Sequence, residues 1–349
     1  MIKQNRSILL DIVKYLAAVL VIYGHVLVYS ESRFDQAMSF IVNISHMPVF
    51  FFVSGYFFVS EIQKYPATEL IRKKTFRLVL PYLLWSSLAL CMNIVLLWCD
   101  THALSIAAVL TEAKAIFLYA RSAWFLIELF FSTLLLIGCS QVAKWTHISI
   151  YPISLVCYLL VYLLALDTLF AVYKIRWLFP SMILGYAWKD RAERIVPRTR
   201  YVRYLAFPLL VRLSKLAFGY QYPEDLFYSV YTIAPAMIGK AVLYQLGSCL
   251  GIIAIFSVAD LLERLPCRVP LADRGTFSLD SYLIHMFFLK LLTFLSSLTL
   301  PAPIKSLIFM LIACLLFEVI YHLCRLILRR IWLYRISLGI LPTPAKKSI

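Results

Sequence analysis

Residues Ile8 to Tyr29 read ILLDIVKYLAAVLVIYGHVLVY, an apolar run long enough to cross a bilayer as one helix. The run contains Asp11, Lys14 and His25 and has no small-residue cleavage pattern. We therefore expect it to remain as a membrane span and not to be removed as a signal peptide. Ionisable side chains are costly in lipid, so these three residues suggest a functional site.

The composition of the whole chain agrees with this stretch. Of 349 residues, 62% are hydrophobic and 15% are charged, and the mean hydropathy is +0.83. Soluble domains contain about 45–50% apolar and about 25% charged residues, so the composition excludes a soluble enzyme and a disordered chain. The apolar runs are continuous and do not alternate, which argues against a membrane β-barrel. The sequence predicts an all-α, polytopic membrane helix bundle that forms one domain over residues 1–349.

Hydropathy predicts about ten transmembrane helices. They lie near residues 8–28, 38–60, 76–98, 122–143, 148–166, 171–188, 204–218, 234–257, 276–296 and 303–324. The region 204–262 is ambiguous, because its first apolar stretch is short and charged and could lie in the interface as an amphipathic helix. The eight cysteines form no CxxC pair and lie mostly in apolar runs, so we expect neither a metal site nor a disulfide framework.

The basic residues predict the orientation of the chain in the membrane. The formal net charge is +16, and 23 of the 34 Lys and Arg fall in segments on the same side as the N-terminus, against 6 on the other side. The positive-inside rule then places both termini in the cytoplasm, with a basic C-terminal tail at about 325–349. Because the cations lie between apolar runs, we expect the lipid bilayer and no nucleic acid as their partner.

The polar residues of the first span share one helix face. Asp11 and Lys14 are three residues apart and can pair. His25 follows Lys14 by about three turns, which puts it on the same stripe about 16 Å further along the axis. Two interpretations remain open: a functional site, or a buried ion pair that fixes helix packing with His25 bonded to a neighbour.

Two further stretches stand out. The second span ends in HMPVFFFVSGY at residues 46–56, where Ser54 and Gly55 permit a close helix approach. A basic cluster then precedes the third span. It could hold phosphates, although the positive-inside rule also places cations there. The cluster consists of Arg72, Lys73, Lys74 and Arg77.

These stretches together resemble the acyltransferase-3 family of integral membrane acyltransferases. The similarity lies in LLDIVKYLAAVLVIYGH, in HMPVFFFVSGYFF and in the basic stretch before RLVLPYLLW, with weaker matches at 123–126, 179–186 and 277–285. The resemblance implies a ten-span bundle in a bacterial cytoplasmic membrane. It also implies transfer of an acyl group, acetyl or succinyl, from acyl-CoA to a hydroxyl of a cell-surface polysaccharide or glycolipid, without a metal.

The resemblance assigns roles to several residues. Lys14 takes the family's Arg-or-Lys position and His25 that of its essential histidine, while Lys74 and Arg77 match an Arg-x-x-Arg pair. Lysine at the first of these two positions lacks the bidentate geometry of arginine. We expect His25 to act as base or as acyl relay, Asp11 and Lys14 to orient the reacting groups, and the basic cluster to bind CoA phosphates.

Other polar residues of the spans are possible acceptor-side contacts. Trp124 and Glu128 lie one turn apart on the fourth span, and Tyr282 and His285 lie on the ninth. His285 shares a face with Ser281 and could instead be a packed, hydrogen-bonded histidine.

A transporter or exporter of a glycan or lipid-linked sugar is the alternative function. Many spans with intramembrane Asp, Lys and His fit that class as well. Against it, the sequence shows no repeat relating its halves and no paired helices broken by Gly or Pro.

Overall fold

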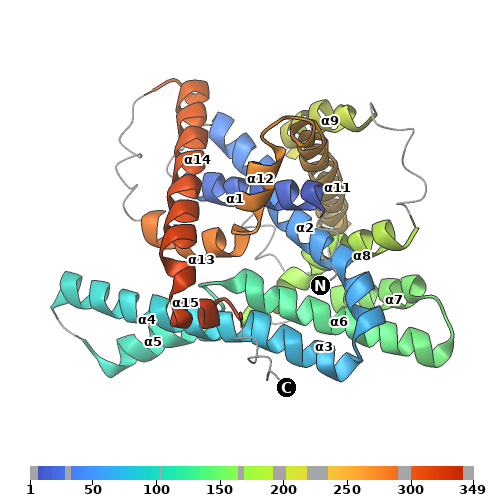
Figure 1. Ribbon diagram of the computed structural model, residues 1–349, viewed down its shortest axis with the longest axis horizontal. Coiled ribbons are helices and arrows are strands. Elements are labelled where there is room, and N and C mark those ends of the chain that lie inside the picture. The colour runs from blue at the N-terminus through green and yellow to red at the C-terminus, as the bar shows by residue number, and fades with distance from the viewer. Residues whose placement is uncertain are drawn as a thin grey trace, which may run out of the picture. The chain divides into compact units, whose positions relative to one another are not determined.

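The computed structural model describes residues 7–27, 33–102, 104–163, 169–191, 202–217, 235–289 and 300–340. These residues form helices and connecting turns, and none of them lies in a β-strand, as Figure 1 shows. The all-α class is therefore confirmed. The chain divides into two compact units, which are described separately below, and the single domain over 1–349 stays a prediction.

The first unit comprises Met1–Glu61, Tyr158–Ala165 and Arg176–His322. Its main helices are α1 (Ile8–Leu27), α2 (Arg33–Lys64), α8 (Ile175–Arg191), α9 (Ala206–Ala217), α11 (Pro235–Glu263), α12 (Arg268–Gly275), α13 (Ser278–Leu289) and α14 (Ala302–Leu326), with a short 3-10 turn, η4 (Val202–Leu205), before α9.

Helix α1 lies in the core of this unit. Its N-terminus is capped by Ser7, whose Oγ accepts a hydrogen bond from the Leu10 N–H at 3.4 Å. Ile12, Val13 and Ala17 of α1 are fully buried and pack with residues of α2, α11 and α12 in one apolar cluster. Because other helices cover α1 on several sides, its polar side chains lie against protein, where such residues are tolerated in membrane proteins.

Glycines allow two helix pairs of the first unit to touch backbone to backbone. Gly55 of α2 lies against the Met182 carbonyl of α8, and Gly185 of α8 lies against the Phe52 carbonyl of α2. A Cβ at either position would overlap a carbonyl oxygen, so the close approach predicted from Ser54 and Gly55 is confirmed. Gly275 of α12 lies in the same way against the Asp11 carbonyl of α1.

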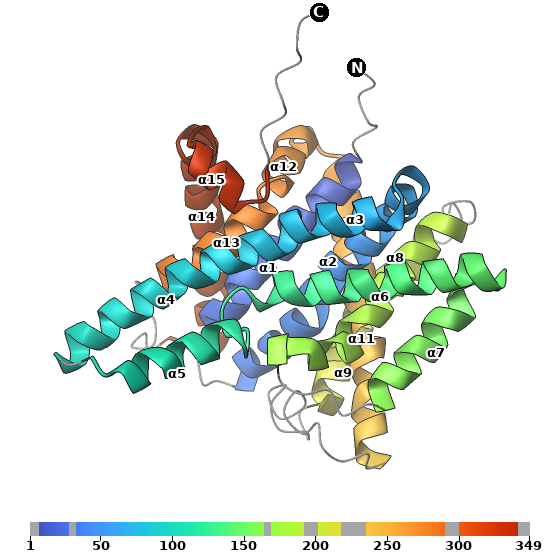
Figure 2. The same cartoon turned by 90° about the horizontal axis from the view of Figure 1, so that it is seen from below.

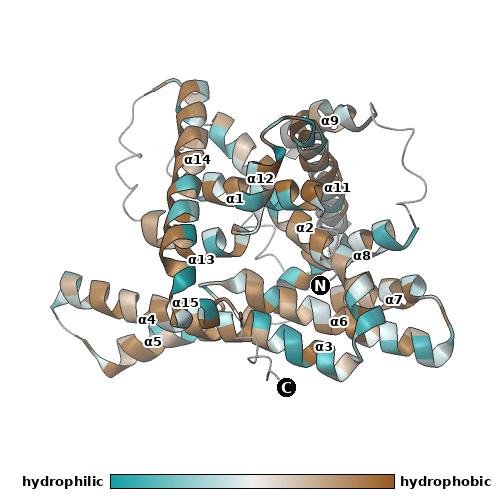
Figure 3. Ribbon diagram, in the orientation of Figure 1, coloured by the Kyte–Doolittle hydropathy of each residue, from teal (hydrophilic) through white to brown (hydrophobic). Residues whose placement is uncertain are grey.

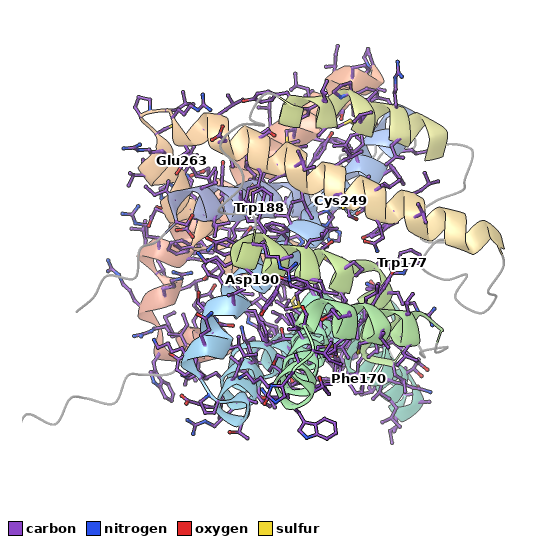
Figure 4. The ribbon with its side chains drawn as sticks, turned by 90° about the vertical axis from the view of Figure 1, so that its right-hand side faces the viewer. Phe170, Trp177, Trp188, Asp190, Cys249 and Glu263 are labelled. Atoms are coloured by element: carbon purple, nitrogen blue, oxygen red, sulfur yellow. The ribbon has the colours of Figure 1, made fainter. Side chains whose placement is uncertain are left out.

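Helices α8 and α11 also contact each other within this unit. The Gln245 amide donates hydrogen bonds to the carbonyls of Arg176 and Trp177 at 3.4 and 3.1 Å, and the Trp177 ring lies 5.2 Å from that of Tyr244. Figure 4 labels Trp177 and Trp188 on α8 and Cys249 and Glu263 on α11. Pro180 of α8 has no N–H to offer the Arg176 carbonyl four residues earlier, so the amide gives that carbonyl a donor.

The second unit comprises Ile62–Cys157, Leu166–Ile175 and Leu323–Ile349. Its elements are α3 (Ala67–Lys74), the π turn η1 (Thr75–Val79), α4 (Leu80–Thr101), α5 (Ile106–Phe117), α6 (Trp124–Thr146), the 3-10 turns η2 (Leu169–Lys174) and η6 (Leu328–Arg330), and α15 (Trp332–Ser337). Helix α7 (Ile150–Leu163) belongs to the second unit up to Cys157 and to the first unit from Tyr158.

One helix of the second unit was not predicted from the sequence. Figure 2 shows α5 beside α4; this helix follows the N-cap Ser105 and lies between the predicted spans near 76–98 and 122–143. The predicted basic tail is folded up to residue 340, and its last nine residues lie outside the described part of the chain. Trp85 of α4 donates to the Ser337 carbonyl at 3.1 Å, so α15 packs on α4.

Among the residues that the structure describes, six helical stretches are long and apolar enough to cross a membrane, by length and composition. They are Ile8–Leu27, Phe34–Lys64, Ala67–Thr101, Trp124–Thr146, Val242–Glu263 and Ala302–Arg330. The third of them runs unbroken through α3, η1 and α4, and Figure 3 shows hydrophilic positions in α3 and a mostly hydrophobic α14. The predicted spans near 148–166, 171–188, 204–218 and 276–296 coincide with shorter helices, and ten spans with both termini in the cytoplasm stays a prediction.

Candidate active site

The ion pair predicted on the first span is present. Lys14 Nζ lies 2.7 Å from Asp11 Oδ1, and the two side chains are 23% and 8% exposed. One turn of helix brings them together, as their spacing predicts. Gly275 of α12 rests on the Asp11 carbonyl, so α12 and this turn of α1 meet backbone to backbone.

His25 lies in the last turn of α1, next to a histidine of α13. The ring centroids of His25 and His285 are 5.1 Å apart, with the ring planes tilted by 40°. His25 is partly exposed, whereas only 1% of His285 is exposed. In the described part of the chain, neither ring nitrogen of His25 makes a hydrogen bond to protein. His25 is therefore the accessible imidazole of the pair.

His285 is held by its own helix. Its Nδ1 lies 3.0 Å from the Ser281 carbonyl one turn earlier, and a carbonyl only accepts, so Nδ1 carries the proton. The other nitrogen, Nε2, is buried and has no hydrogen-bond partner among the described residues. The Tyr282 ring lies 6.1 Å from the His285 ring. Of the two acceptor-side candidates of the ninth predicted span, His285 thus lies beside His25, and Tyr282 lies beside His285.

A third histidine belongs to this group, and the sequence analysis missed it. His46 of α2 is 6% exposed and lies close enough to interact electrostatically with both His25 and His285. Its Nδ1 donates to the Val42 carbonyl at 2.5 Å. The available signal was a histidine within the apolar stretch before Pro48, which is itself unusual in a membrane helix. We call His25, His46 and His285 the histidine cluster.

The basic cluster lies in the second unit, where α3 passes into the π turn η1. Lys73 Nζ pairs with Glu69 at 2.8 Å and lies 3.0 Å from the centroid of the Tyr65 ring, so this cation is already engaged. Lys64 and Lys73 lower the pKa of the Tyr65 phenol. The side chains of Arg72 and Arg77 are exposed.

A residue near the C-terminal end of the described chain contacts the backbone of this cluster. Gly339, at φ +68°, lies against the Phe76 carbonyl and the Arg77 Cα. A left-handed conformation with no room for a Cβ requires glycine at that position. The folded end of the chain therefore supports the turn that carries Arg77.

Trp124 and Glu128 also lie in the second unit, at the start of α6. Glu128 is 0% exposed, and neither of its carboxylate oxygens has a hydrogen-bond partner among the described residues. Lys174, at the end of η2, places its Nζ 3.4 Å from the centroid of the Trp124 ring and interacts electrostatically with Glu128. A buried carboxylate, an aromatic face and an ammonium group thus gather at one place.

The predicted residues therefore fall into two groups. Asp11, Lys14, His25, Tyr282 and His285 lie in the first unit, while the basic cluster, Trp124 and Glu128 lie in the second. Among the described residues, no group of three or more His, Cys, Asp or Glu side chains has the arrangement of a metal site.

These features define a class: an α-helical membrane protein whose core contains an imidazole cluster able to act as an acid or base. A family model described as an acyltransferase domain matches residues 8–322, and the chain belongs to this acyltransferase family, the one that its motifs resemble. Membership implies O-acyltransferase activity in general terms. Comparisons with curated proteins and with solved structures found no match.

Proposed function

We propose that the protein transfers an acetyl or succinyl group from acyl-CoA to a hydroxyl of a cell-surface polysaccharide or glycolipid, with His25 as the catalytic base. The observation that carries this proposal is the state of His25: a partly exposed imidazole with no hydrogen bond from either ring nitrogen, within a buried cluster. A neutral imidazole with a bare ring nitrogen in that position can accept the proton of an attacking hydroxyl.

The proposed reaction needs no group beyond the two substrates. The acceptor hydroxyl oxygen attacks the thioester carbonyl carbon while its proton moves to His25. The C–S bond then breaks, the new ester leaves, and the CoA thiolate takes the proton back from His25. The Asp11–Lys14 pair would orient α1, the helix that carries His25, and the polar groups near the pair. The spacing of the three residues puts the pair and His25 on the same face of α1.

The basic cluster would hold the CoA phosphates. Arginine and lysine bind phosphate through charge-assisted hydrogen bonds, and the exposure of Arg72 and Arg77 leaves both guanidinium groups accessible. The contacts of Lys73 with Glu69 and Tyr65 make it the weaker candidate in this cluster. We choose Lys74 and Arg77 for mutation, because these two positions match the Arg-x-x-Arg pair of the family.

The acceptor would use the group around Trp124 and Glu128. A carboxylate with two unpartnered oxygens can accept hydrogen bonds from sugar hydroxyls, and an aromatic face can stack on a sugar ring. On the His25 side, Tyr282 would contact the acceptor, and His285 would act through the His25 ring. We further propose that the protein resides in a bacterial cytoplasmic membrane.

His25→Ala tests the proposal directly. We expect transfer from radiolabelled acetyl- or succinyl-CoA to isolated envelope glycan to fall by a factor of about 100 or more, since general base catalysis contributes about 10²–10⁴. Thermal unfolding in detergent should stay close to that of the unchanged protein. His322→Ala is the matched control, because His322 lies 3.8 Å from Glu318 on α14 and outside the histidine cluster. Full activity of His25→Ala would refute the assignment of the base.

A further inference from the structure

Two members of the histidine cluster have their tautomers set by their own helices. His46 and His285 each donate Nδ1–H to a backbone carbonyl one turn earlier, Val42 and Ser281 respectively. A neutral imidazole has one donor and one acceptor nitrogen, so each of these two rings presents a bare Nε2. Neither ring can donate a second hydrogen bond while it is neutral.

His25 is the remaining ring, and it is the one with an N–H to give. No hydrogen bond to protein engages either of its nitrogens in the described part of the chain. An unsatisfied acceptor lies next to its ring: Nε2 of His285 is buried without a hydrogen-bond partner among the described residues. Buried acceptors are costly when unpaired, so an N–H within reach has a reason to turn toward it.

We propose that Nε2 of His285 accepts a hydrogen bond from the N–H of His25 and so makes His285 the positioning residue of the base. This inference rests on the proposed function of His25. At a centroid separation of 5.1 Å, a small rotation of either ring brings the edge nitrogens within hydrogen-bonding distance. Catalytic hydrogen bonds are often long without substrate and shorten when it binds.

This hydrogen bond would fix which nitrogen of the His25 ring carries the proton. The nitrogen that faces His285 keeps its proton, and the opposite nitrogen is bare and available to the acceptor hydroxyl. When His25 takes the hydroxyl proton, the resulting imidazolium still donates to His285, which stabilises its charge in an apolar site. His285 thus acts on the tautomer and orientation of His25 and does not touch the substrates.

Two substitutions separate this role from simple packing. His285→Asn keeps a side-chain N–H close to the Nδ1 position for the Ser281 carbonyl but removes the acceptor at Nε2. His285→Gln places an amide oxygen close to the Nε2 position and can accept from His25. We expect kcat of the Asn variant to fall about 100-fold with KM for acyl-CoA unchanged, and kcat of the Gln variant to stay within about tenfold of the unchanged protein.

A purely structural His285 predicts a different pattern. Equal losses in both variants, or full activity of the Asn variant, would overturn the proposal. His322→Asn, outside the cluster, controls for the loss of an imidazole on a neighbouring helix.

A measurement that does not depend on activity distinguishes failure of this inference from failure of the proposed function. In ¹⁵N-histidine NMR spectra of the full chain in detergent, His285 should show a protonated Nδ1 and a bare Nε2. His25→Ala should shift the Nε2 resonance of His285 and leave its Nδ1 resonance in place. An unmoved Nε2 resonance would contradict the hydrogen bond, whatever reaction the protein catalyses.

Discussion

In an apolar helix bundle, the tautomer of a histidine depends on which of its ring nitrogens, if either, donates to a backbone carbonyl. His46 and His285 both donate to the backbone one turn earlier, whereas His25 in the last turn of α1 does not. The same residue type therefore has different chemistry at three positions. That difference, and not the presence of histidine alone, makes His25 the candidate base.

The basic cluster leads to a prediction at the same scale. If Lys74 and Arg77 bind CoA phosphates, Lys74→Gln or Arg77→Gln should each raise the Kd for CoA by about ten- to a hundredfold, because a charge-assisted contact is lost. The effect should shrink at high salt, since exposed charges are screened. Isothermal titration of the purified, folded variants with CoA measures it, with Lys144→Gln as control. Unchanged CoA affinity in the double variant Lys74→Gln/Arg77→Gln would contradict phosphate binding and would mean that the cluster serves only to orient the chain in the membrane.

At the scale of elements, glycines determine how closely the helices of the first unit approach. Gly185 of α8 and Gly55 of α2 each meet a carbonyl of the opposite helix, and Gly275 meets the carbonyl of Asp11. Small residues allow such contact in membrane bundles. Lipid tails are as apolar as the helices, so close packing, and not the hydrophobic effect, drives helix association there. These three positions therefore hold α2, α8, α1 and α12 in place around the site residues.

Gly185→Ala should lower the stability of the protein. The added Cβ would overlap the Phe52 carbonyl, which as backbone cannot move aside cheaply, so we expect a loss of about 1–3 kcal/mol. Gly138→Ala on α6 is the matched control, because nothing lies within 4 Å of a Cβ there. We expect it to be neutral or stabilising by up to about 1 kcal/mol. Thermal unfolding in detergent compares the two, and equal melting temperatures would show that the helices can separate at this crossing.

The continuous helix from Ala67 to Thr101 is another feature of this scale. It carries the basic cluster in its first turns and passes into the apolar α4 through the π turn η1. Inserted π turns occur often at functional sites, since they change the direction in which side chains point. Gly339 and Ser337 from the end of the chain contact this helix at Arg77 and Trp85.

At the scale of the whole molecule, the distribution of cations leads to a test of topology. With both termini in the cytoplasm, reporter fusions after Lys64 and after Pro197 should both read as cytoplasmic, since each follows an even number of predicted spans. Pro197 lies outside the described residues, so this fusion rests on the sequence alone. An exported signal at either position would show that the predicted series of spans is wrong.

Much of the first span could be predicted from its sequence. The pairing of Asp11 with Lys14 follows from a spacing of three, and the helix itself follows from an apolar run in lipid. The helix at Ile106–Phe117 was missed, because a short apolar stretch between spans has no distinctive periodicity. His46 was missed as a site residue, because its partners lie on α1 and α13, far away in the chain.

The sequence by itself determined the helical class, the membrane environment, the family and the pairing of Asp11 with Lys14 in the first span. These depend on composition and on contacts within a few turns, which a linear pattern contains. The tertiary structure decided which of these residues meet: His25 with His285 and His46, Lys174 with Trp124 and Glu128, and the chain end with Arg77. Such contacts depend on how helices pack, and packing in lipid is set by shape and small residues that hydropathy does not distinguish.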